Sequence, residues 1–180
     1  MKVTLTALPG VLVLEPKVFS DARGFFLESY NEKAMADVGI VDHFVQDNHS
    51  HSARNVLRGL HYQIRCPQSK LIRVVIGEIL DVAVDLRRNS PTFGRWTGVN
   101  LSGENQQMLW IPSGLAHGFR VLSESAHVLY KATDFYHPEF ERTIAWNDPD
   151  LDIDWRLDGT PTVSAKDGLG VRLRDAEIFE

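Results

Sequence analysis

Two histidines in separate segments are the side chains of this sequence best suited to proton transfer. His61 lies in the segment Arg58-Gly59-Leu60-His61-Tyr62-Gln63, and His117 lies in the segment Pro112-Ser113-Gly114-Leu115-Ala116-His117. Imidazole is the side chain that most often acts as a general base near neutral pH. A lone histidine on a strand is nevertheless more often a packed or surface residue than a catalyst. Only the joint pattern of the two segments favours a functional interpretation.

The two segments resemble the paired motifs of the cupin superfamily, in which the first motif supplies two histidines and a glutamate as metal ligands and the second supplies another histidine. In this chain Gln63 stands at the position of the second histidine. Lys70 stands at the position of the glutamate, at the same distance before the turn residue Gly77. An ammonium group cannot coordinate a metal, and its charge repels a divalent cation close by. We therefore expect a pocket without a metal.

A pocket with this lysine can still stabilise an anion. A fixed positive charge in a low-dielectric site favours an oxyanion such as an enolate. Proton abstraction beside a ketone needs a base, a cation near the carbonyl oxygen and, for inversion, an acid on the opposite face of the ring. His61, Lys70 and a phenol could fill these roles, and Tyr130 is the candidate phenol. The alternative is that Tyr130 is an ordinary core tyrosine, and its spacing alone favours that alternative.

A second group of side chains suits an anion and an aromatic base: Phe19, Asp21, Arg23, Gly24, Phe26 and Glu28, followed by Gln46, Asn48 and Arg58. Arginine fits phosphate because its donors form a planar fork. Both arginines could equally be surface ion-pair partners, and both phenylalanines could equally belong to the core. Tyr136 with Glu141 offers a ring for stacking and a carboxylate acceptor for a pyrimidine N–H, although a tyrosine beside Pro138 could simply pack.

Short strands must position these side chains. The alternation of Val82, Val84 and Leu86 with Asp81, Ala83 and Asp85 indicates a strand with one buried face. Strands are expected at residues 71–75, 79–86, 97–101, 107–111, 118–122 and 127–133, separated by Gly, Pro, Ser and Asn. A further strand pair is expected early in the chain, interrupted at Pro9-Gly10. One helix is expected outside the sheet, from the N-cap Asn31 through Val38, with Gly39 as a left-handed C-cap.

Many short strands with turn residues between them are typical of a double-sheet sandwich or jelly-roll barrel, with the functional site inside it. The length of 180 residues suits one domain, which we place over residues 1–180. The tail from Asp148 onward is rich in Asp, Pro and Gly, and we expect it to pack back on the barrel.

Composition and charge exclude several classes of protein. Hydrophobic residues make up 43% of the chain and charged residues 24%, which is typical of a globular protein rather than a disordered one. The net charge of -5 disfavours nucleic acid as a partner. Cys66 is the only cysteine, so an intrachain disulfide and a site with several thiolates are excluded. No segment predicts a signal sequence or a membrane span, and we expect a cytoplasmic protein.

Over nearly its full length the chain resembles the dTDP-4-dehydrorhamnose 3,5-epimerase family of the rhamnose-precursor pathway. The segments that carry the resemblance are residues 19–28, 44–50, 58–63, 110–119, 130–134 and 164–167. Together these motifs are highly specific, although none of them is specific alone. The resemblance implies an all-β cupin fold, a double-stranded β-helix or jelly roll with a few short peripheral helices.

The resemblance also implies an isomerase that needs no cofactor and acts as a homodimer. Its reaction inverts carbons 3 and 5 of a 4-keto-6-deoxyhexose carried on dTDP, through an enolate. Carried over by motif, His61 is the base, Asp167 its carboxylate partner, Tyr130 the acid and Lys70 the enolate-stabilising cation. The remaining positions bind substrate: His117 lines the pocket, Arg23 and Arg58 hold the diphosphate, Gln46 and Asn48 lie near it, and Phe19, Phe26, Glu28, Tyr136, Glu141 and Lys166 hold the nucleotide.

Four positions depart from the family pattern: Leu115 replaces a usual Phe, Ser69 a usual Gly, His127 a usual acidic residue and Arg156 a usual Pro. None of them removes a proposed catalytic group. The sequence leaves open a mono-epimerase that acts on carbon 3 or carbon 5 alone of a related dTDP-sugar. From other classes it leaves open a metal-binding cupin oxygenase and a cupin that only binds a sugar.

Overall fold

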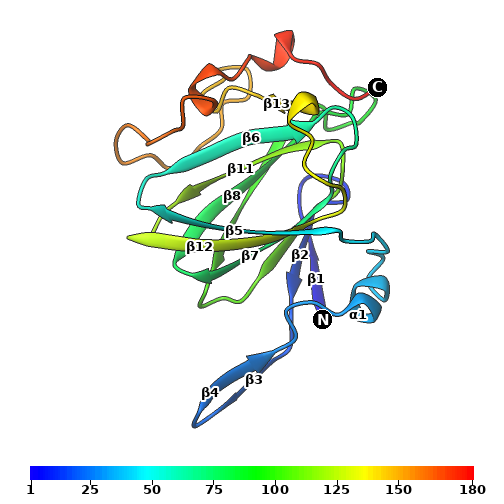
Figure 1. The fold of residues 1–180 in the computed structure, drawn as a ribbon, viewed down its shortest axis with the longest axis vertical. Helices are drawn as coiled ribbons and strands as arrows, with labels where there is room; N and C mark the ends of the chain where they lie inside the picture. The colour runs from blue at the N-terminus through cyan, green and yellow to red at the C-terminus, as the bar shows by residue number, and fades with distance from the viewer.

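Two antiparallel β-sheets face each other and form the main body of the protein (Figure 1). The computed structural model describes all residues from 1 to 180. The six-stranded sheet has the strand order β1-β2-β10-β7-β12-β5, and the five-stranded sheet has the order β13-β6-β11-β8-β9. This architecture confirms the expected all-β jelly roll.

The strands of the six-stranded sheet are β1 (Lys2–Leu5), β2 (Leu12–Glu15), β5 (Gln46–Ala53), β7 (Lys70–Ile76), β10 (Met108–Ile111) and β12 (Ser125–Ala132). Those of the five-stranded sheet are β6 (Leu57–Gln63), β8 (Glu78–Asp85), β9 (Trp96–Ser102), β11 (Leu115–Val121) and β13 (Glu141–Thr143). Strands β3 (Val18–Asp21) and β4 (Gly24–Leu27) form a separate hairpin. The helices are α1 (Glu32–Ala36) and three short 3₁₀ segments at Pro138–Phe140, Asp167–Leu169 and Leu173–Asp175.

Aliphatic side chains from both sheets fill the space between them, because every second residue of a strand points to the same face. Ile72 and Val128 from the six-stranded sheet meet Ile79 and Phe119 from the five-stranded sheet in one buried cluster. All four side chains are at most 4% exposed. The predicted strands lie where the structure has them, with ends that differ by a few residues.

Strand β8 is buried on both faces, and here the sequence-based interpretation of one buried face is wrong. Every residue from Ile79 to Asp85 is buried. The apolar face, with Leu80 and Val82, packs under the C-terminal tail together with Leu151 and Trp155. The other face carries Ile79 and Ala83 into the core between the sheets. The charged residues that alternate with the apolar ones therefore do not face solvent.

The tail after Asp148 covers the outer face of the five-stranded sheet, as the sequence predicted (Figure 1). Apart from its two 3₁₀ turns, it has little regular structure. The tail pairs with the barrel through single β-bridges: Thr162 of the tail pairs with Val56, and Val171 of the tail pairs with Ile144. Burial of its Leu and Trp side chains is the main force that holds the tail there.

The N-terminal segments also match their predictions in part. Strands β1 and β2 pair as expected. Helix α1 begins after Asn31, whose side chain accepts a hydrogen bond from the backbone N–H of Ala34, and it ends at Ala36, earlier than predicted. Gly39 does adopt the expected left-handed conformation, with a φ of 86°. Met35 anchors the helix on the outside of the six-stranded sheet. None of the helices has the length and hydrophobicity that a transmembrane helix requires.

The burial of Leu80 under the tail can be tested by truncating its side chain. Leu80 is 1% exposed, so Leu80→Ala should lower the free energy of unfolding by about 2–5 kcal/mol, the usual cost of a cavity in a core. Leu5→Ala is the matched control, because Leu5 is 79% exposed and should change stability by at most ~0.5 kcal/mol. Urea denaturation measures both values. Equal losses for the two variants would contradict the placement of the tail.

Candidate active site

The two histidines singled out by the sequence lie directly opposite each other on neighbouring strands. His61 of β6 pairs with His117 of β11. The strands approach closely because Gly59 and Gly118 have no side chains at the crossing. A Cβ on Gly59 would lie 2.6 Å from the Cα of Gly118, and the φ of Gly59 is +120°. Another residue at position 59 would therefore push the strands apart.

His61 forms a hydrogen bond with a carboxylate from the C-terminal tail. Its Nε2 lies 2.5 Å from Oδ1 of Asp167, which begins a 3₁₀ turn and is 3% exposed. Burial alone would raise the pKa of Asp167, but hydrogen bonds from His61, Ser164 and Gly59 hold it below its usual value. Because the ionised carboxylate accepts the proton of Nε2, Nδ1 is left as the basic nitrogen of His61.

His117 has a carboxylate partner that sequence reasoning missed. Its Nε2 lies 2.8 Å from Oδ1 of Asp81, and the two side chains are 8% and 0% exposed. Asp81 lies on β8, on the face of the strand that points between the sheets. The available signal was the alternation of Asp81 and Asp85 with apolar residues, which becomes informative once both faces of the strand are known to be buried.

Lys70 and Tyr130 come from the opposite sheet. The ammonium nitrogen of Lys70 on β7 lies 5.9 Å from the ring centre of Tyr130 on β12. Burial lowers the pKa of Lys70 to about 8, and the negative charges of Asp81 and Glu141 oppose this effect. Burial and the charge of Glu141 raise the pKa of Tyr130, while Arg58 lowers it. The phenol therefore stays protonated at neutral pH and can donate a proton.

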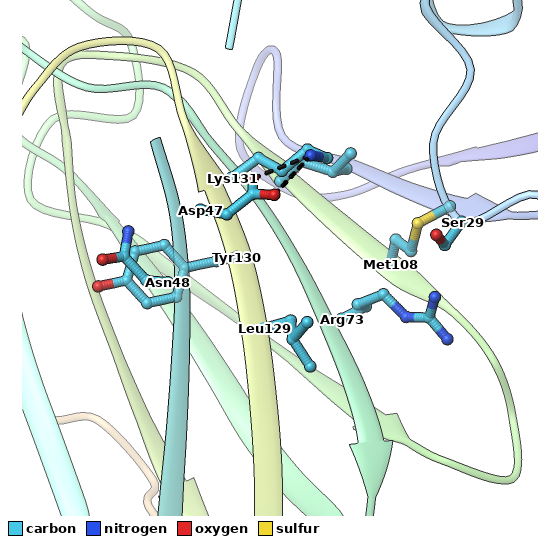
Figure 2. Close-up of a pocket in the computed structure, with 9 residues that line it drawn as sticks. Ser29, Asp47, Asn48, Arg73, Met108, Leu129, Tyr130 and Lys131 are labelled. Atoms are coloured by element: carbon cyan, nitrogen blue, oxygen red, sulfur yellow. Dashed lines mark hydrogen bonds and ion pairs between the residues drawn. The ribbon is translucent and has the colours of Figure 1, made fainter. Parts of the chain in front are cut away.

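Tyr130 points into the barrel rather than outward. Figure 2 shows the Tyr130 ring next to Asn48, on the other side of the sheet from Leu129 and Arg73. Tyr130 and Asn48 are direct partners in the pairing of β12 with β5. The Nδ2 atom of Asn48 is buried and has no hydrogen-bond partner. The same is true of the Oγ atom of Ser50 on the same strand. Both groups are therefore available to a bound ligand.

These side chains share one cavity of about 350 Å³ between the two sheets. Its lining residues are Gln46, Asn48, Ser50, Arg58, His61, Gln68, Lys70, His117, Gly118, Phe119, Tyr130, Tyr136, Glu141 and Lys166. A smaller cavity of about 130 Å³ opens between Ser29, Arg73 and Met108 (Figure 2). It contains neither histidine, so the larger cavity is the candidate active site.

One end of the cavity combines positive charge with an aromatic ring. Glu141 accepts hydrogen bonds from Nζ of Lys166 at 2.8 Å and from the hydroxyl of Tyr136 at 2.7 Å. Both oxygens of the Glu141 carboxylate thus already accept a hydrogen bond. The sequence had predicted a carboxylate free to accept one from a pyrimidine. Arg58 donates to Ser52 at 2.9 Å. No carboxylate pairs with the guanidinium of Arg58, which leaves its remaining donors for an anion.

Four of the expected substrate-binding residues lie outside this cavity. Phe19, Arg23 and Phe26 belong to the β3–β4 hairpin, which extends away from the barrel (Figure 1), and Glu28 follows it. Phe19 is 51% exposed and Phe26 is 66% exposed, so neither belongs to the core. Arg23 forms an ion pair with Asp21 at 2.5 Å on the surface of the hairpin. Within one chain, the structure does not bring these residues to His61.

Gln63 serves as a loop anchor. Its amide nitrogen donates to the backbone carbonyls of Cys66 and Phe135, and its amide oxygen accepts from the backbone N–H of His137. Ser69 likewise ties segments together, because its Oγ accepts from the backbone N–H of Ser113. Both side chains are at most 4% exposed.

Comparison with known proteins identifies the family. A family model described as dTDP-4-dehydrorhamnose 3,5-epimerase matches residues 5–175. A protein of that name from Pseudomonas aeruginosa is 59% identical in an alignment of 180 positions that covers 99% of each chain. The chain belongs to the dTDP-4-dehydrorhamnose 3,5-epimerase family. It is accordingly an isomerase, as the resemblance in its motifs implied.

Solved structures agree with this family. An epimerase from Legionella pneumophila, determined in complex with dTDP-4-keto-L-rhamnose, is 50% identical and superposes with a TM-score of 0.96. The match covers 98% of this chain and 94% of that chain. A 3′-monoepimerase from Streptomyces bikiniensis, in complex with dTDP-quinovose, is more distant. It is 34% identical, with a TM-score of 0.88, and the match covers 94% of this chain and 86% of that chain.

The donor groups of the epimerase cavity predict that activity does not depend on a metal. The ammonium of Lys70 lines the cavity beside both histidines, and each histidine directs Nε2 to a carboxylate. Dialysis against EDTA should leave the rate of epimerisation unchanged, and elemental analysis should find less than ~0.1 metal ion per chain. A stoichiometric metal whose removal abolishes activity would contradict this prediction.

Proposed function

We propose that this epimerase converts dTDP-4-dehydro-6-deoxy-D-glucose to dTDP-4-dehydro-L-rhamnose by inverting carbons 3 and 5, as a step of dTDP-L-rhamnose formation. One observation carries the assignment of roles. His61 and Tyr130 come from different sheets and line the same cavity, with Lys70 beside Tyr130. A base and an acid on opposite walls are the arrangement that inversion at carbon requires.

The reaction begins with removal of a proton beside the ketone. Nδ1 of His61 takes the proton from carbon 3, and the electron pair of the broken C–H bond moves into the ketone to form an enolate. The ammonium of Lys70 stabilises the negative oxygen. The hydroxyl of Tyr130 then protonates carbon 3 from the opposite face. Proton exchange with solvent restores His61 and Tyr130, and the same steps invert carbon 5.

Asp167 supports this chemistry without touching the substrate. Its ionised carboxylate holds Nε2 of His61 and stabilises the imidazolium that forms when Nδ1 takes the proton. The raised pKa of Tyr130, caused by burial and by Glu141, keeps the phenol in its acid form before the transfer. His117 lines the same cavity as His61 and Tyr130.

The dTDP group fits the cationic end of the cavity. Arg58 and Lys166 line it and can receive the diphosphate, while the amides of Gln46 and Asn48 lie close by. The ring of Tyr136 is 51% exposed, so one face is accessible for stacking with thymine. Glu141 holds Lys166 and Tyr136 in position through its two hydrogen bonds.

Inversion of a single carbon is the second candidate, because the Streptomyces bikiniensis relative is described as a 3′-monoepimerase. The relative that is 59% identical is named a 3,5-epimerase, which favours the double inversion. The proposed catalytic groups would serve both reactions. Deuterium labelling from solvent separates the two, because each inverted carbon acquires one solvent hydrogen.

Incubation of dTDP-4-dehydro-6-deoxy-D-glucose with the enzyme in D₂O should place deuterium at both carbon 3 and carbon 5, as measured by NMR. His61→Ala should lower the rate of exchange by about 10²–10⁴-fold or more, since the base is lost. Asp167→Asn should cost less, because the imidazole itself remains. Label at one carbon only would establish a mono-epimerase, and equal losses in the two variants would contradict the supporting role of Asp167.

We further propose a cytoplasmic homodimer in which the β3–β4 hairpin of one chain completes the cavity of the other. The hairpin makes no sheet with its own barrel. Phe19 pairs with Phe26 across the hairpin, so their rings share one face, and this face is exposed within a single chain. Two exposed aromatic rings beside an arginine are better suited to contact a nucleotide than to face water.

Mixed dimers test whether the hairpin acts in the partner. His61→Ala and the double variant Arg23→Ala/Phe26→Ala should each be impaired, the latter through a raised KM for the dTDP-sugar. Refolding them together in equal amounts should restore roughly a quarter of the wild-type activity, because half of the dimers then contain one intact site. Phe25→Ala is the control, since Phe25 lies on the other face of the hairpin. No recovery on mixing would show that each site is built from one chain.

A further inference from the structure

Asp81 is a buried carboxylate whose hydrogen bonding is incomplete. It is 0% exposed, and Oδ1 accepts the single hydrogen bond from His117 at 2.8 Å. Oδ2 is buried and has no hydrogen-bond partner. A buried ionised carboxylate is costly unless opposite charge or hydrogen bonds compensate it. The structure keeps Asp81 in spite of this cost.

Asp85, on the same strand, is a buried carboxylate whose charge is compensated by its own hydrogen-bond partners. It is also 0% exposed and lies on the same face of β8. It accepts hydrogen bonds from the side chains of Arg87, Ser90 and Thr92, and together these hold its pKa at about 2 against the effect of burial. Asp85 therefore needs no charge from the cavity, whereas Asp81 has no arginine of its own.

The positive charge of Lys70, which lines the cavity together with His117, interacts with Asp81. Burial lowers the pKa of Lys70, and Asp81 is the largest of the charges that raise it again, followed by Glu141. The titratable and charged groups that line this cavity with Lys70 are Arg58 and His61 of β6, His117 of β11, Tyr130 of β12, Tyr136, Glu141 of β13 and Lys166 of the tail, and Asp81 of β8 lies behind His117, to which it is hydrogen-bonded. Among them Asp81 is the most deeply buried, so solvent screens its field least.

We propose that Asp81 is a positioning residue that keeps Lys70 in its ammonium form and orients His117, and thereby maintains the cation at the enolate oxygen. This proposal rests on the role assigned to Lys70 under the proposed function. The carboxylate does not touch the substrate, because His117 lies between Asp81 and the cavity. Its effect on the reaction is therefore exerted through the charge of Lys70.

The pH dependence follows from the sign of this interaction. A negative charge near an amine favours the protonated form, so removal of the charge makes Lys70 lose its proton at lower pH. The alkaline limb of kcat in the wild type should lie near pH 8, the pKa of Lys70. In Asp81→Asn this limb should move down by about one pH unit, so that activity falls about fivefold at pH 8 and much less at pH 6.5.

The experiment compares Asp81→Asn with Asp85→Asn, a matched loss of one buried carboxylate on the same strand. Lysine labelled with ¹³C at Cε reports the protonation of Lys70 by NMR, and Lys70→Gln assigns its signal. Asp81→Asn should lower the midpoint of this titration together with the alkaline limb of kcat. Asp85→Asn should lower the urea midpoint of unfolding and leave both titrations in place.

Two further variants keep the outcome decisive. Asp81→Glu retains the charge and should restore the wild-type alkaline limb, while Asp81→Ser removes the charge in case the asparagine variant does not fold. An unchanged titration of Lys70 in the folded Asp81 variants would overturn the proposal. Full activity of Lys70→Gln would instead refute the proposed role of Lys70, whatever the effect of Asp81 on its titration.

Discussion

Packing of the C-terminal tail on the outer face of the five-stranded sheet is the constraint on which the site depends. Leu151 and Trp155 bury the apolar face of β8, and this leaves the interior of the barrel as the only place for the polar face of that strand. The same packing brings Asp167 to within 2.5 Å of His61. Hydrophobic burial on one side of the sheet thus determines the electrostatics on the other side.

The electrostatics of the cavity follow from two imidazole–carboxylate pairs placed side by side. The two histidines, His61 paired with Asp167 and His117 paired with Asp81, lie on neighbouring strands that approach closely at Gly59. The pairs differ in depth, since Asp81 is fully buried while the His61 side chain is 25% exposed. The exposed pair is suited to exchange protons with substrate and solvent, and the buried pair is suited to provide a constant field.

In the proposed complex, the barrel and the hairpin contact different parts of the substrate. The barrel holds the groups that act on the sugar ring, on rigid strands with little freedom to move. The β3–β4 hairpin carries exposed aromatic rings on an element without a core of its own. An isolated two-stranded hairpin is only marginally stable in water. The proposed dimer would supply the surface that both the hairpin and the nucleotide lack within one chain.

The fold class, the family and the local chemistry could all be predicted from the order of the amino acids. Strand periodicity, the motifs around His61 and His117, and the replacement of ligands by Gln63 and Lys70 are all contained in short segments. Local patterns report which residues share a strand face, because that depends only on backbone geometry. The inward direction of Tyr130 needed the sheet, since an inward catalytic phenol and a core tyrosine follow the same alternation.

Contacts between residues that are distant in the sequence became known from the packed structure alone. Asp167 reaches His61 from the far end of the chain, and the family resemblance rather than local spacing had suggested that pair. The burial of Asp81 does not follow from the alternation in β8, because a single strand does not reveal what covers its two sides. Phe26 and the rest of the hairpin, expected beside the substrate, lie away from the cavity of their own chain. Contacts of this kind depend on how layers pack, and packing is a property of the whole chain rather than of any segment.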